Sequence, residues 1–341
     1  METKLIKINS EDDFKLLDEP AKALREGMLV ALPTETVYGL GANALDEDAV
    51  KKIFLAKGRP QDNPLIVHIY DKSQLDSLAD EISENAKKVM DSFWPGPLTV
   101  IVKRSSIVPD SVTAGLSTVA IRMPSNKTAL ELLKRSGVPV AAPSANTSGK
   151  PSPTKASHVF DDLGGKIPYI VDGGDSEVGL ESTVLDTTEE IPKILRPGGI
   201  TKKELESVLG KVLYDPALSD SSKTPKAPGM KYKHYAPKAE LTVFVGKDAE
   251  KIAKERIREI SKEGKKTGLI LLDRNDDNAD FVILLGNTPE DYAKHIFVAL
   301  REMDVKGVDI IYAAMPFDGD GIETAIKNRI FKAAAGRVVQ C

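Results

Sequence analysis

The feature that most constrains the fold is residues 214–238, a stretch without periodicity between two regions in which strand and helix patterns alternate. It reads YDPALSDSSKTPKAPGMKYKHYAPK, and this composition, rich in proline, serine and lysine, is typical of a linker. A chain of 341 residues is also long for a single hydrophobic core. We therefore expect two domains, residues 1–213 and 239–341, joined by a linker over residues 214–238.

Residues 1–213 predict a mixed α/β domain. Short apolar runs rich in β-branched residues indicate buried strands, and amphipathic segments between some of them indicate helices. The expected strands cover residues 28–32, 65–69, 98–102, 118–122, 138–142, 169–171, 183–186 and 193–195. The expected helices cover residues 12–26, 46–56, 81–91, 126–136 and 202–209.

Residues 239–341 alternate strand and helix patterns regularly, which predicts a smaller, Rossmann-like domain with a parallel sheet. The expected strands are 241–245, 267–272, 281–285 and 309–313, and the expected helices are 248–263, 289–303 and 322–335. The sequence of this region has neither a G-x-G-x-x-G after a strand nor a G-x-x-x-x-G-K-[ST]. We therefore expect no second active site in this domain.

Composition narrows the class of protein. No run approaches the ~20 apolar residues of a membrane helix, and the early acidic residues are unlike a targeting peptide, so we expect a cytoplasmic protein. The four histidines lie far apart in the sequence and the one cysteine is Cys341, so we expect no protein-bound metal. A formal net charge of −4 argues against a protein dedicated to coating nucleic acid through a basic surface.

Polar side chains concentrate in LPTETVYGLG, residues 32–41, which we expect to connect a strand to a helix. The segment holds the hydroxyls of Thr34, Thr36 and Tyr38 and the carboxylate of Glu35. A polar loop at the end of a buried strand can hold a small polar ligand. Taken alone, however, the motif is slightly better explained as a tight structural turn.

The next expected helix ends in KGRP, residues 57–60. Gly58 can adopt the left-handed conformation that ends a helix, and Pro60 blocks its continuation. Lys57 and Arg59 would then lie on a rigid corner from which both can reach one anion, such as a triphosphate. Basic residues at a helix C-terminus are also favoured by the helix dipole, so this motif alone leaves both interpretations open.

Further segments place hydroxyl, amide or cationic side chains near strand ends. These residues are Asn63, His68, Thr118, Arg122, Ser144, Asn146, Ser152, Ser182 and Arg196. Arg122 is the sole charge in an apolar strand and needs an anionic partner, either a protein carboxylate or a ligand. A lone histidine such as His68 is more often simply a packed residue. The sequence has no evident Ser-His-Asp or Cys-His pairing, which suits a reaction driven by positioning and charge neutralisation, as in nucleotidyl transfer.

In this order, the motifs PTETVYGLG, KGRP, DNPLIVHI, AIRMP, PSAN and ILRPGG resemble those of the YrdC-type threonylcarbamoyl-AMP synthases. From the linker onward the chain resembles the longer branch of that family, which adds a Rossmann-like domain. The resemblance implies a YrdC-like twisted mixed sheet and a nucleotidyltransferase. That enzyme converts L-threonine, bicarbonate and ATP into threonylcarbamoyl-AMP and pyrophosphate. The product would pass to a tRNA threonylcarbamoyltransferase, which modifies the adenosine beside the anticodon.

The resemblance also implies the roles of individual residues. Threonine or its carbamate would be held by Thr36, His68, Arg122, Ser182 and the backbone of Ala142. ATP, with Mg²⁺, would be held by Lys57, Arg59, Asn63, Thr118, Ser144, Asn146, Ser152 and Arg196. Lys57 and Arg59 would also be the catalytic residues, because they would offset the charge on the leaving pyrophosphate. The linker would close over the nucleotide as a lid, through Tyr232, His234 or Tyr235.

Other interpretations of the sequence concern its function, its C-terminal domain and the general base. An RNA-binding protein of the same fold could present the basic side chains of Lys57, Arg59, Lys103, Arg104 and Lys150. Weak tRNA binding also stays open for the enzyme itself. A related carbamoyltransferase domain, from hydrogenase maturation, accompanies zinc-finger and acylphosphatase segments for which this chain has no room. The C-terminal domain could instead serve in partner docking. For the reaction itself, the choice of a general base between Glu35 and Glu181 is undecided.

Overall fold

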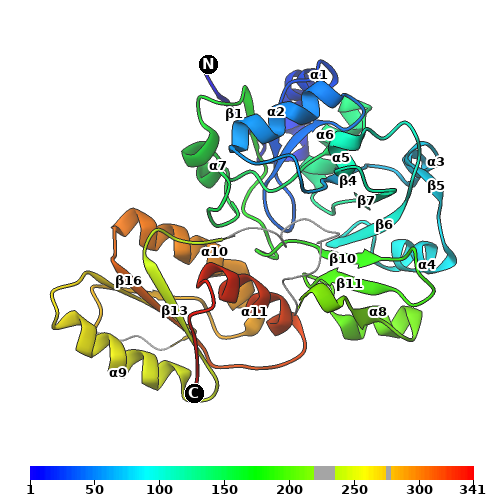
Figure 1. Cartoon of the computed structure of the whole chain (residues 1–341). Helices are drawn as coiled ribbons and strands as arrows, with labels where there is room; N and C mark the ends of the chain where they lie inside the picture. The colour runs from blue at the N-terminus through cyan, green and yellow to red at the C-terminus, as the bar shows by residue number, and fades with distance from the viewer. Residues whose placement is uncertain (219–234, 274–277) are drawn as a thin grey trace. The chain divides into compact units, whose positions relative to one another are not determined.

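The computed structural model describes residues 1–218, 235–273 and 278–341 (Figure 1). These residues divide into two compact units. The first takes residues 1–148, 153–177 and 181–218, and the second takes residues 149–152, 178–180 and those described from 235 onward. In the described part of the chain, no helix is long and apolar enough to cross a membrane.

The first unit is built on a twelve-stranded sheet, counted over the described residues. The order is β1-β9-β2-β3-β8-β4-β7-β6-β10-β11-β12, and β5 pairs with β6. The strands are β1 (Lys4–Lys7), β2 (Val30–Leu32), β3 (Gly39–Asn43), β4 (Ile66–His68), β5 (Ala79–Glu81), β6 (Leu98–Arg104), β7 (Thr118–Arg122), β8 (Val140–Ala141), β9 (Tyr169–Asp172), β10 (Thr183–Asp186), β11 (Lys193–Arg196) and β12 (Leu213–Tyr214). The sheet contains parallel pairs, such as β4 with β7, and antiparallel pairs, such as β6 with β7, so the mixed sheet expected from the family resemblance is confirmed.

Helices and short 3-10 turns connect these strands. They are η1 (Glu11–Leu17), α1 (Asp18–Arg25), α2 (Glu47–Lys57), η2 (Lys72–Gln74), α3 (Leu75–Leu78), α4 (Glu84–Phe93), α5 (Asp110–Thr113), α6 (Lys127–Ser136), α7 (Ala156–Leu163), α8 (Lys202–Leu209) and η3 (Pro216–Leu218). Helix α2 begins and ends as its sequence predicts. The Asp46 side chain accepts hydrogen bonds from the backbone N–H groups of Asp48 and Ala49, and Gly58 closes the helix with a φ of 61°.

The segment of residues 32–41 is a hairpin, so the expected strand-to-helix loop is wrong. Strand β3 starts at Gly39 and runs antiparallel to β2, with Leu32 opposite Gly39. A β-carbon on Gly41 would lie 2.8 Å from Val140 Cγ1 and 2.9 Å from Leu32 Cδ2, so any larger residue would force these neighbours to move. A strand of glycine, alanine and leucine lacks β-branched residues, and this hid it from the sequence pattern.

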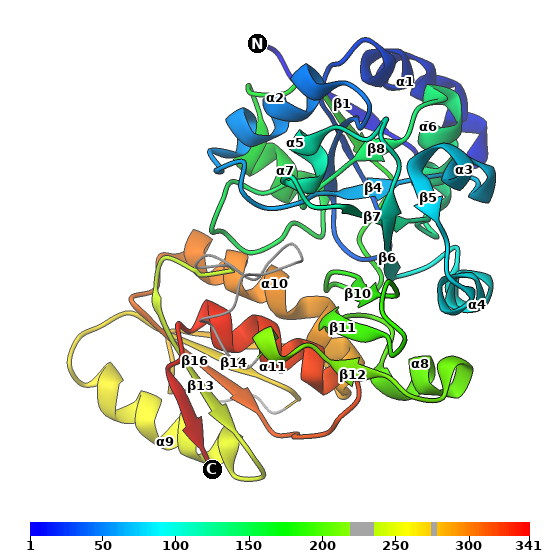
Figure 2. The same ribbon diagram turned by 45° about the vertical axis from the view of Figure 1, so that its right-hand side comes forward.

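The second unit has a five-stranded sheet in the order β15-β14-β16-β13-β17, counted over the described residues. Its strands are β13 (Glu240–Val245), β14 (Thr267–Leu271), β15 (Phe281–Leu284), β16 (Ile310–Met315) and β17 (Val338–Gln340). All four pairings are parallel, which confirms the Rossmann-like expectation, although β17 was not predicted. Helix α9 (Ala249–Ser261) lies on one face, and α10 (Pro289–Lys306) and α11 (Ile322–Ala333) lie on the other (Figure 2).

Two short loops from earlier in the chain belong to the second unit. The Arg301 guanidinium donates to the carbonyl oxygen of Pro151 through Nε at 3.1 Å and Nη2 at 2.6 Å. The Ala236 N–H donates to the carbonyl of Gly149 at 3.0 Å. Gly179 packs so closely on α10 that a β-carbon would lie 2.4 Å from the Cα of Lys294. Nothing in the local sequence of these loops predicts this assignment.

Candidate active site

Three of the expected site residues of the first unit, His68, Thr118 and Arg122, project from one face of its sheet. Side chains alternate between faces along a strand, so Thr118, Ala120 and Arg122 of β7 share a face. His68 of β4 lies directly opposite Arg122 in the parallel register. Between these polar groups the same face carries a small apolar cluster of Ile66, Ile101, Ala120, Val184 and Leu195. Residues at alternating positions of the same strands, Val67, Val100 and Ile121, belong to the main hydrophobic core. One face of these strands therefore packs on the core, and the other carries the polar groups.

Arg122 is the centre of a buried polar cluster. Its Nη1 donates to Thr36 Oγ1 at 2.8 Å, its Nε donates to the Gly96 carbonyl at 3.3 Å, and its Nη2 lies 2.7 Å from Glu35 Oε1. The side chains of Arg122 and Glu35 are only 4% and 5% exposed. The anionic partner expected for Arg122 is therefore, in this structure, the carboxylate of Glu35. Because buried charges need partners, this pair fixes both side chains.

The turn that carries Glu35 and Thr36 is organised by Thr34. The Thr34 hydroxyl donates to the Val37 carbonyl at 2.6 Å and accepts from the N–H groups of Thr36 and Val37 at 3.2 Å. Ser176 Oγ donates to the Thr34 carbonyl at 3.0 Å. These bonds make the loop a rigid turn, so the consecutive side chains of Glu35 and Thr36 are both held at the Arg122 guanidinium.

His68 is buried and electrically neutral. Burial and the neighbouring Arg122 charge lower the pKa of His68 to about 3. Its Nδ1 lies 3.2 Å from the Ile66 carbonyl oxygen. At neutral pH the ring is therefore a hydrogen-bonding group without charge, beside the Arg122 guanidinium.

Lys57 connects the end of α2 to the loop that follows β8. Its Nζ donates to the carbonyl oxygens of Ser144 and Asn146, both at 2.5 Å, and the Ser148 N–H donates to the Lys57 carbonyl at 3.0 Å. Within the loop, Ser144 Oγ donates to Asn146 Oδ1 at 2.5 Å. The three residues expected at ATP are thus assembled at one place, with Lys57 holding the loop through two backbone carbonyls.

Arg59 and Asn63 lie in the connection between α2 and β4. Arg59 is half-buried, and its N–H donates to the Phe54 carbonyl at 3.0 Å. Asn63 is 1% exposed, and its Nδ2 has no hydrogen-bond partner among the described residues. A buried amide donor without a partner is uncommon in folded proteins and suits a ligand acceptor.

A second buried hydroxyl cluster joins three strands. Ser182 Oγ lies 2.8 Å from Thr99 Oγ1 on β6 and accepts from Arg196 Nη2 at 3.1 Å. Arg196 Nε also donates to the Ser182 carbonyl at 3.1 Å. The structure therefore brings Ser182 and Arg196 together. Thr99 was not among the expected site residues, although it is the sole hydroxyl in the apolar run LTVIV, which was the available signal.

The other expected residues are placed less closely. Thr118 starts β7, at the end of that strand opposite to Arg122. The Ala142 N–H donates to the Ile66 carbonyl at 2.9 Å, so a backbone contact from Ala142 to a ligand would use its carbonyl.

Ser152 is buried in the second unit. Tyr235 also belongs to the second unit, where its ring stacks on Phe297 at 5.2 Å. Tyr232 and His234 lie outside the described residues.

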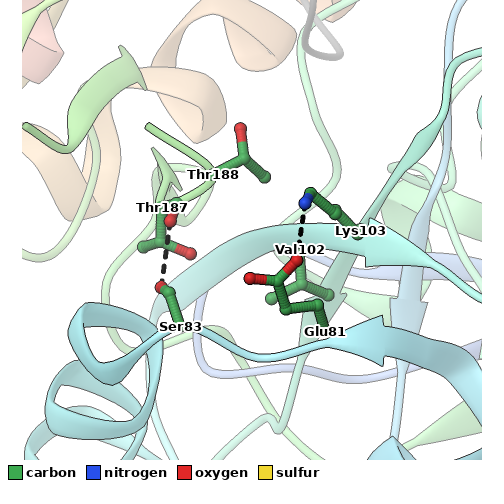
Figure 3. Close-up of a pocket in the computed structure, with 6 residues that line it drawn as sticks. All are labelled: Glu81, Ser83, Val102, Lys103, Thr187 and Thr188. Carbon is green, nitrogen blue, oxygen red and sulfur yellow. Dashed lines mark hydrogen bonds and ion pairs between the residues drawn. The ribbon is translucent and has the colours of Figure 1, made fainter. Parts of the chain in front are cut away.

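A cavity of about 30 Å³ elsewhere in the first unit has no comparable unpaired group (Figure 3). Its lining residues are Glu81, Ser83, Val102, Lys103, Thr187 and Thr188. Lys103 Nζ pairs with Glu81 at 2.5 Å, and Ser83 Oγ donates to the Thr187 carbonyl at 2.9 Å. This volume has room for only a few water molecules, so it is no substrate site.

No group of three His, Cys, Asp or Glu side chains that could hold a metal ion occurs among the residues described. Mg²⁺ commonly binds through substrate phosphates with few protein ligands.

Comparisons with known proteins cover the whole chain. A family model described as "Telomere recombination" matches residues 22–198, and one described as "Threonylcarbamoyl-AMP synthase, C-terminal domain" matches residues 200–335. A threonylcarbamoyl-AMP synthase of Pyrococcus abyssi is 53% identical over 321 residues, which cover 93% of each chain. One of Bacillus subtilis is 49% identical over 350 residues, which cover 100% of each chain.

The structural comparison agrees. The crystal structure of P. abyssi Sua5 complexed with L-threonine matches with a TM-score of 0.95 at 49% identity, covering 99% of this chain and 100% of that one. Both matched family models, both relatives and this structure lead to one assignment. The chain belongs to the Sua5/YrdC family of threonylcarbamoyl-AMP synthases, in the branch with a C-terminal domain.

Proposed function

We propose that this enzyme makes threonylcarbamoyl-AMP and pyrophosphate from L-threonine, bicarbonate and ATP on the sheet face that carries Arg122 and His68. The observation that carries the proposal is the buried Arg122, which is held at Thr36 beside a neutral histidine. A guanidinium can bind a carboxylate through two parallel hydrogen bonds. Arg122 would thus orient the threonine carboxylate, and orientation itself lowers the barrier to reaction.

The rest of the threonine site follows from the same face. The neutral ring of His68, the hydroxyl of Thr36 and the carbonyl of Ala142 would contact threonine or its carbamate beside Arg122. Ser182 would contribute its hydroxyl, which Arg196 and Thr99 hold in place. These groups can hydrogen-bond the β-hydroxyl of threonine, and a site with such groups disfavours a substrate that lacks it.

For ATP we propose the residues inferred from the family motifs. They are Lys57, Arg59, Asn63, Thr118, Ser144, Asn146, Ser152 and Arg196, with Tyr232, His234 or Tyr235 from the linker. The unpartnered Asn63 amide and the assembly of Lys57 with the Ser144–Asn146 loop support this assignment. Mg²⁺ would enter with the nucleotide and neutralise phosphate charge.

The reaction needs no protein nucleophile. The deprotonated amine of threonine combines with bicarbonate to give a carbamate and water. A carbamate oxygen then attacks the α-phosphorus of ATP, and the bond to pyrophosphate breaks. Lys57 and Arg59 would stabilise the negative charge on that leaving group. We further propose that the product passes to a tRNA threonylcarbamoyltransferase.

The direct test is pyrophosphate release from ATP by the purified chain, with and without L-threonine and bicarbonate. We expect release that requires both, with serine and glycine much poorer than threonine. Glycine lacks the β-hydroxyl and the methyl group, and serine lacks the methyl group. If no threonine-dependent release occurs with Mg²⁺ present, the assignment of the reaction fails. Salt-sensitive RNA binding without turnover would then favour the RNA-binding alternative.

A further inference from the structure

We propose that Glu35 binds the α-ammonium group of threonine, so that Glu35 and Arg122 together recognise an amino-acid zwitterion. This inference rests on the proposed threonine site at Arg122. It assigns a role to a side chain that the expected binding residues did not include. In the proposed site Arg122 binds the carboxylate, and the ammonium group has only neutral acceptors such as the Ala142 carbonyl and no charged partner.

The first support is the state of the Glu35 carboxylate. It is 5% exposed, and Arg122 Nη2 lies 2.7 Å from its Oε1. Neither carboxylate oxygen has a hydrogen-bond partner among the described residues. An ionised carboxylate can accept about four hydrogen bonds, and buried polar atoms normally have at least one. A buried carboxylate with this much unused accepting capacity suits a donor from a ligand.

The second support is how Arg122 is used. Its Nη1 is bonded to Thr36 and its Nε to the Gly96 carbonyl, so Nη2 is the group that faces Glu35. A substrate carboxylate that binds at Nη2 would compete with Glu35 for that cation. Glu35 would then need another positive group, and an α-amino acid carries one on the carbon next to its carboxylate.

The third support is the charge balance of the buried site. Arg122 and Glu35 together are neutral, and a zwitterion adds no net charge to them. A hydroxy acid has the carboxylate but no ammonium group, so its binding would leave one net negative charge in the buried site of Arg122 and Glu35. Such a buried, uncompensated charge is strongly disfavoured. The pair therefore selects for α-amino acids by electrostatics, in addition to any contact with the β-hydroxyl.

The turn keeps Glu35 in position for this role. The Thr34 hydroxyl accepts from the N–H groups of Thr36 and Val37, which follow Glu35, and Ser176 holds the Thr34 carbonyl, which precedes it. Consecutive side chains, Glu35 and Thr36, therefore reach the same guanidinium. A purely structural counter-ion of Arg122 would have the same geometry, so a test must separate the two roles.

The test compares two ligands by isothermal titration calorimetry, without bicarbonate and at about neutral pH, so that the threonine amine stays protonated. L-Threonine carries the ammonium, and (R)-3-hydroxybutyrate keeps the carboxylate, the β-hydroxyl and the methyl group but lacks the amine. In the unaltered chain we expect L-threonine to bind at least about tenfold more tightly, because a charge-assisted hydrogen bond is worth that much. Equal binding would overturn the proposal without any variant.

Glu35→Gln then removes the charge with little change of shape. We expect it to weaken L-threonine binding by about tenfold or more and to leave 3-hydroxybutyrate binding unchanged or tighter. Equal weakening of both ligands, or no change for either, would mean that Glu35 only supports Arg122. Glu35→Asp keeps the charge and should retain part of the preference for L-threonine. Thermal unfolding of each variant checks that the measurement is made on folded protein.

Arg122→Lys separates failure of this inference from failure of the proposed threonine site. A lysine cannot make the forked contacts, so both ligands should bind more weakly. Arg104→Lys is the matched control, because Arg104 pairs with Asp110 and Thr113 away from these groups. If Arg122→Lys leaves both ligands unaffected, the threonine site itself is misplaced. If it weakens both while Glu35→Gln does not discriminate between them, only the role of Glu35 is lost.

Discussion

At the scale of single residues, the site depends on charged groups that are buried and partnered. Arg122 contacts a hydroxyl, a carbonyl and a carboxylate, and Lys57 contacts two carbonyls. Such groups lose their bound water on folding, and only fixed polar partners compensate this cost. These partners also orient the charged groups before a substrate arrives. Removing one partner leaves the other buried without compensation, so binding and stability are linked at these positions.

The low pKa of His68 predicts how stability depends on pH. The folded chain keeps His68 neutral down to a pKa of about 3, whereas the unfolded chain binds a proton near pH 6.5. Between these values the unfolded state binds more protons, so the free energy of unfolding falls as pH falls, by about 1.4 kcal/mol per pH unit from this group. His68→Gln removes this contribution.

The measurement is urea unfolding of both proteins at about pH 6.5 and pH 5. We expect the free energy of unfolding to fall by about 2 kcal/mol more in the unaltered chain than in His68→Gln. All other titrating groups are shared by the two proteins and cancel in this comparison. Equal losses in the two proteins would contradict a neutral, buried His68.

At the scale of elements, the hairpin of β2 and β3 positions the turn that meets Arg122. Its register places Leu32 opposite Gly39, and the glycines of β3 let the strand pack closely against its neighbours. Sequence periodicity predicted β2, β4, β6, β7 and β10 because these strands are apolar and β-branched. It missed β3 because glycine and alanine carry no such signal, so the order of the sheet around Thr36 could not be foreseen.

Gly41→Ala tests the close packing of β3. The added β-carbon would lie 2.8 Å from Val140 Cγ1 and 2.9 Å from Leu32 Cδ2, so neighbouring side chains must move. We expect a loss of roughly 1–3 kcal/mol in the free energy of unfolding, seen as a lower thermal midpoint. Gly39→Ala is the matched control, because its nearest contact would be 3.2 Å and its cost should be smaller. Equal midpoints for the two variants would contradict this packing.

At the scale of the whole molecule, the chain does not divide in sequence order. Residues 149–152 and 178–180 belong to the second unit, although the regions around them build the first. Arg301 holds the Pro151 carbonyl, and Gly179 lies against α10. Ser152, expected at ATP, therefore follows a residue that the second unit fixes. Domain boundaries at residues 213 and 239 would assign both of these loops to the first domain, whereas the structure assigns them to the second unit.

Truncation before Pro228 tests the role of the C-terminal part. The shortened chain lacks Tyr232, His234 and Tyr235, and it lacks the Arg301 support for residues 149–152. We expect weaker ATP binding or early release of the labile anhydride, because water would reach the intermediate. Arg301→Lys in the full chain removes the forked contact to Pro151 and leaves the linker, so it separates the two causes. Unchanged ATP affinity and product yield in the truncated chain would contradict a lid.

The sequence by itself determined the family and much of the local structure. Periodicity located strands such as Thr118–Arg122 and Thr183–Asp186 with the bounds that the structure has, and ordered motifs predicted the enzyme class. These features depend on neighbouring residues, whose side-chain alternation and capping act over short stretches of chain.

Only the tertiary structure decided which of these residues meet. Arg122 and Thr36 are 86 residues apart in sequence, and Ser182 and Thr99 are 83 apart. Their contacts depend on the order of the strands and on which face each side chain takes, and a sequence pattern fixes neither. The same holds for the pairing of Glu35 with Arg122, because a buried arginine requires an anion but does not specify which one.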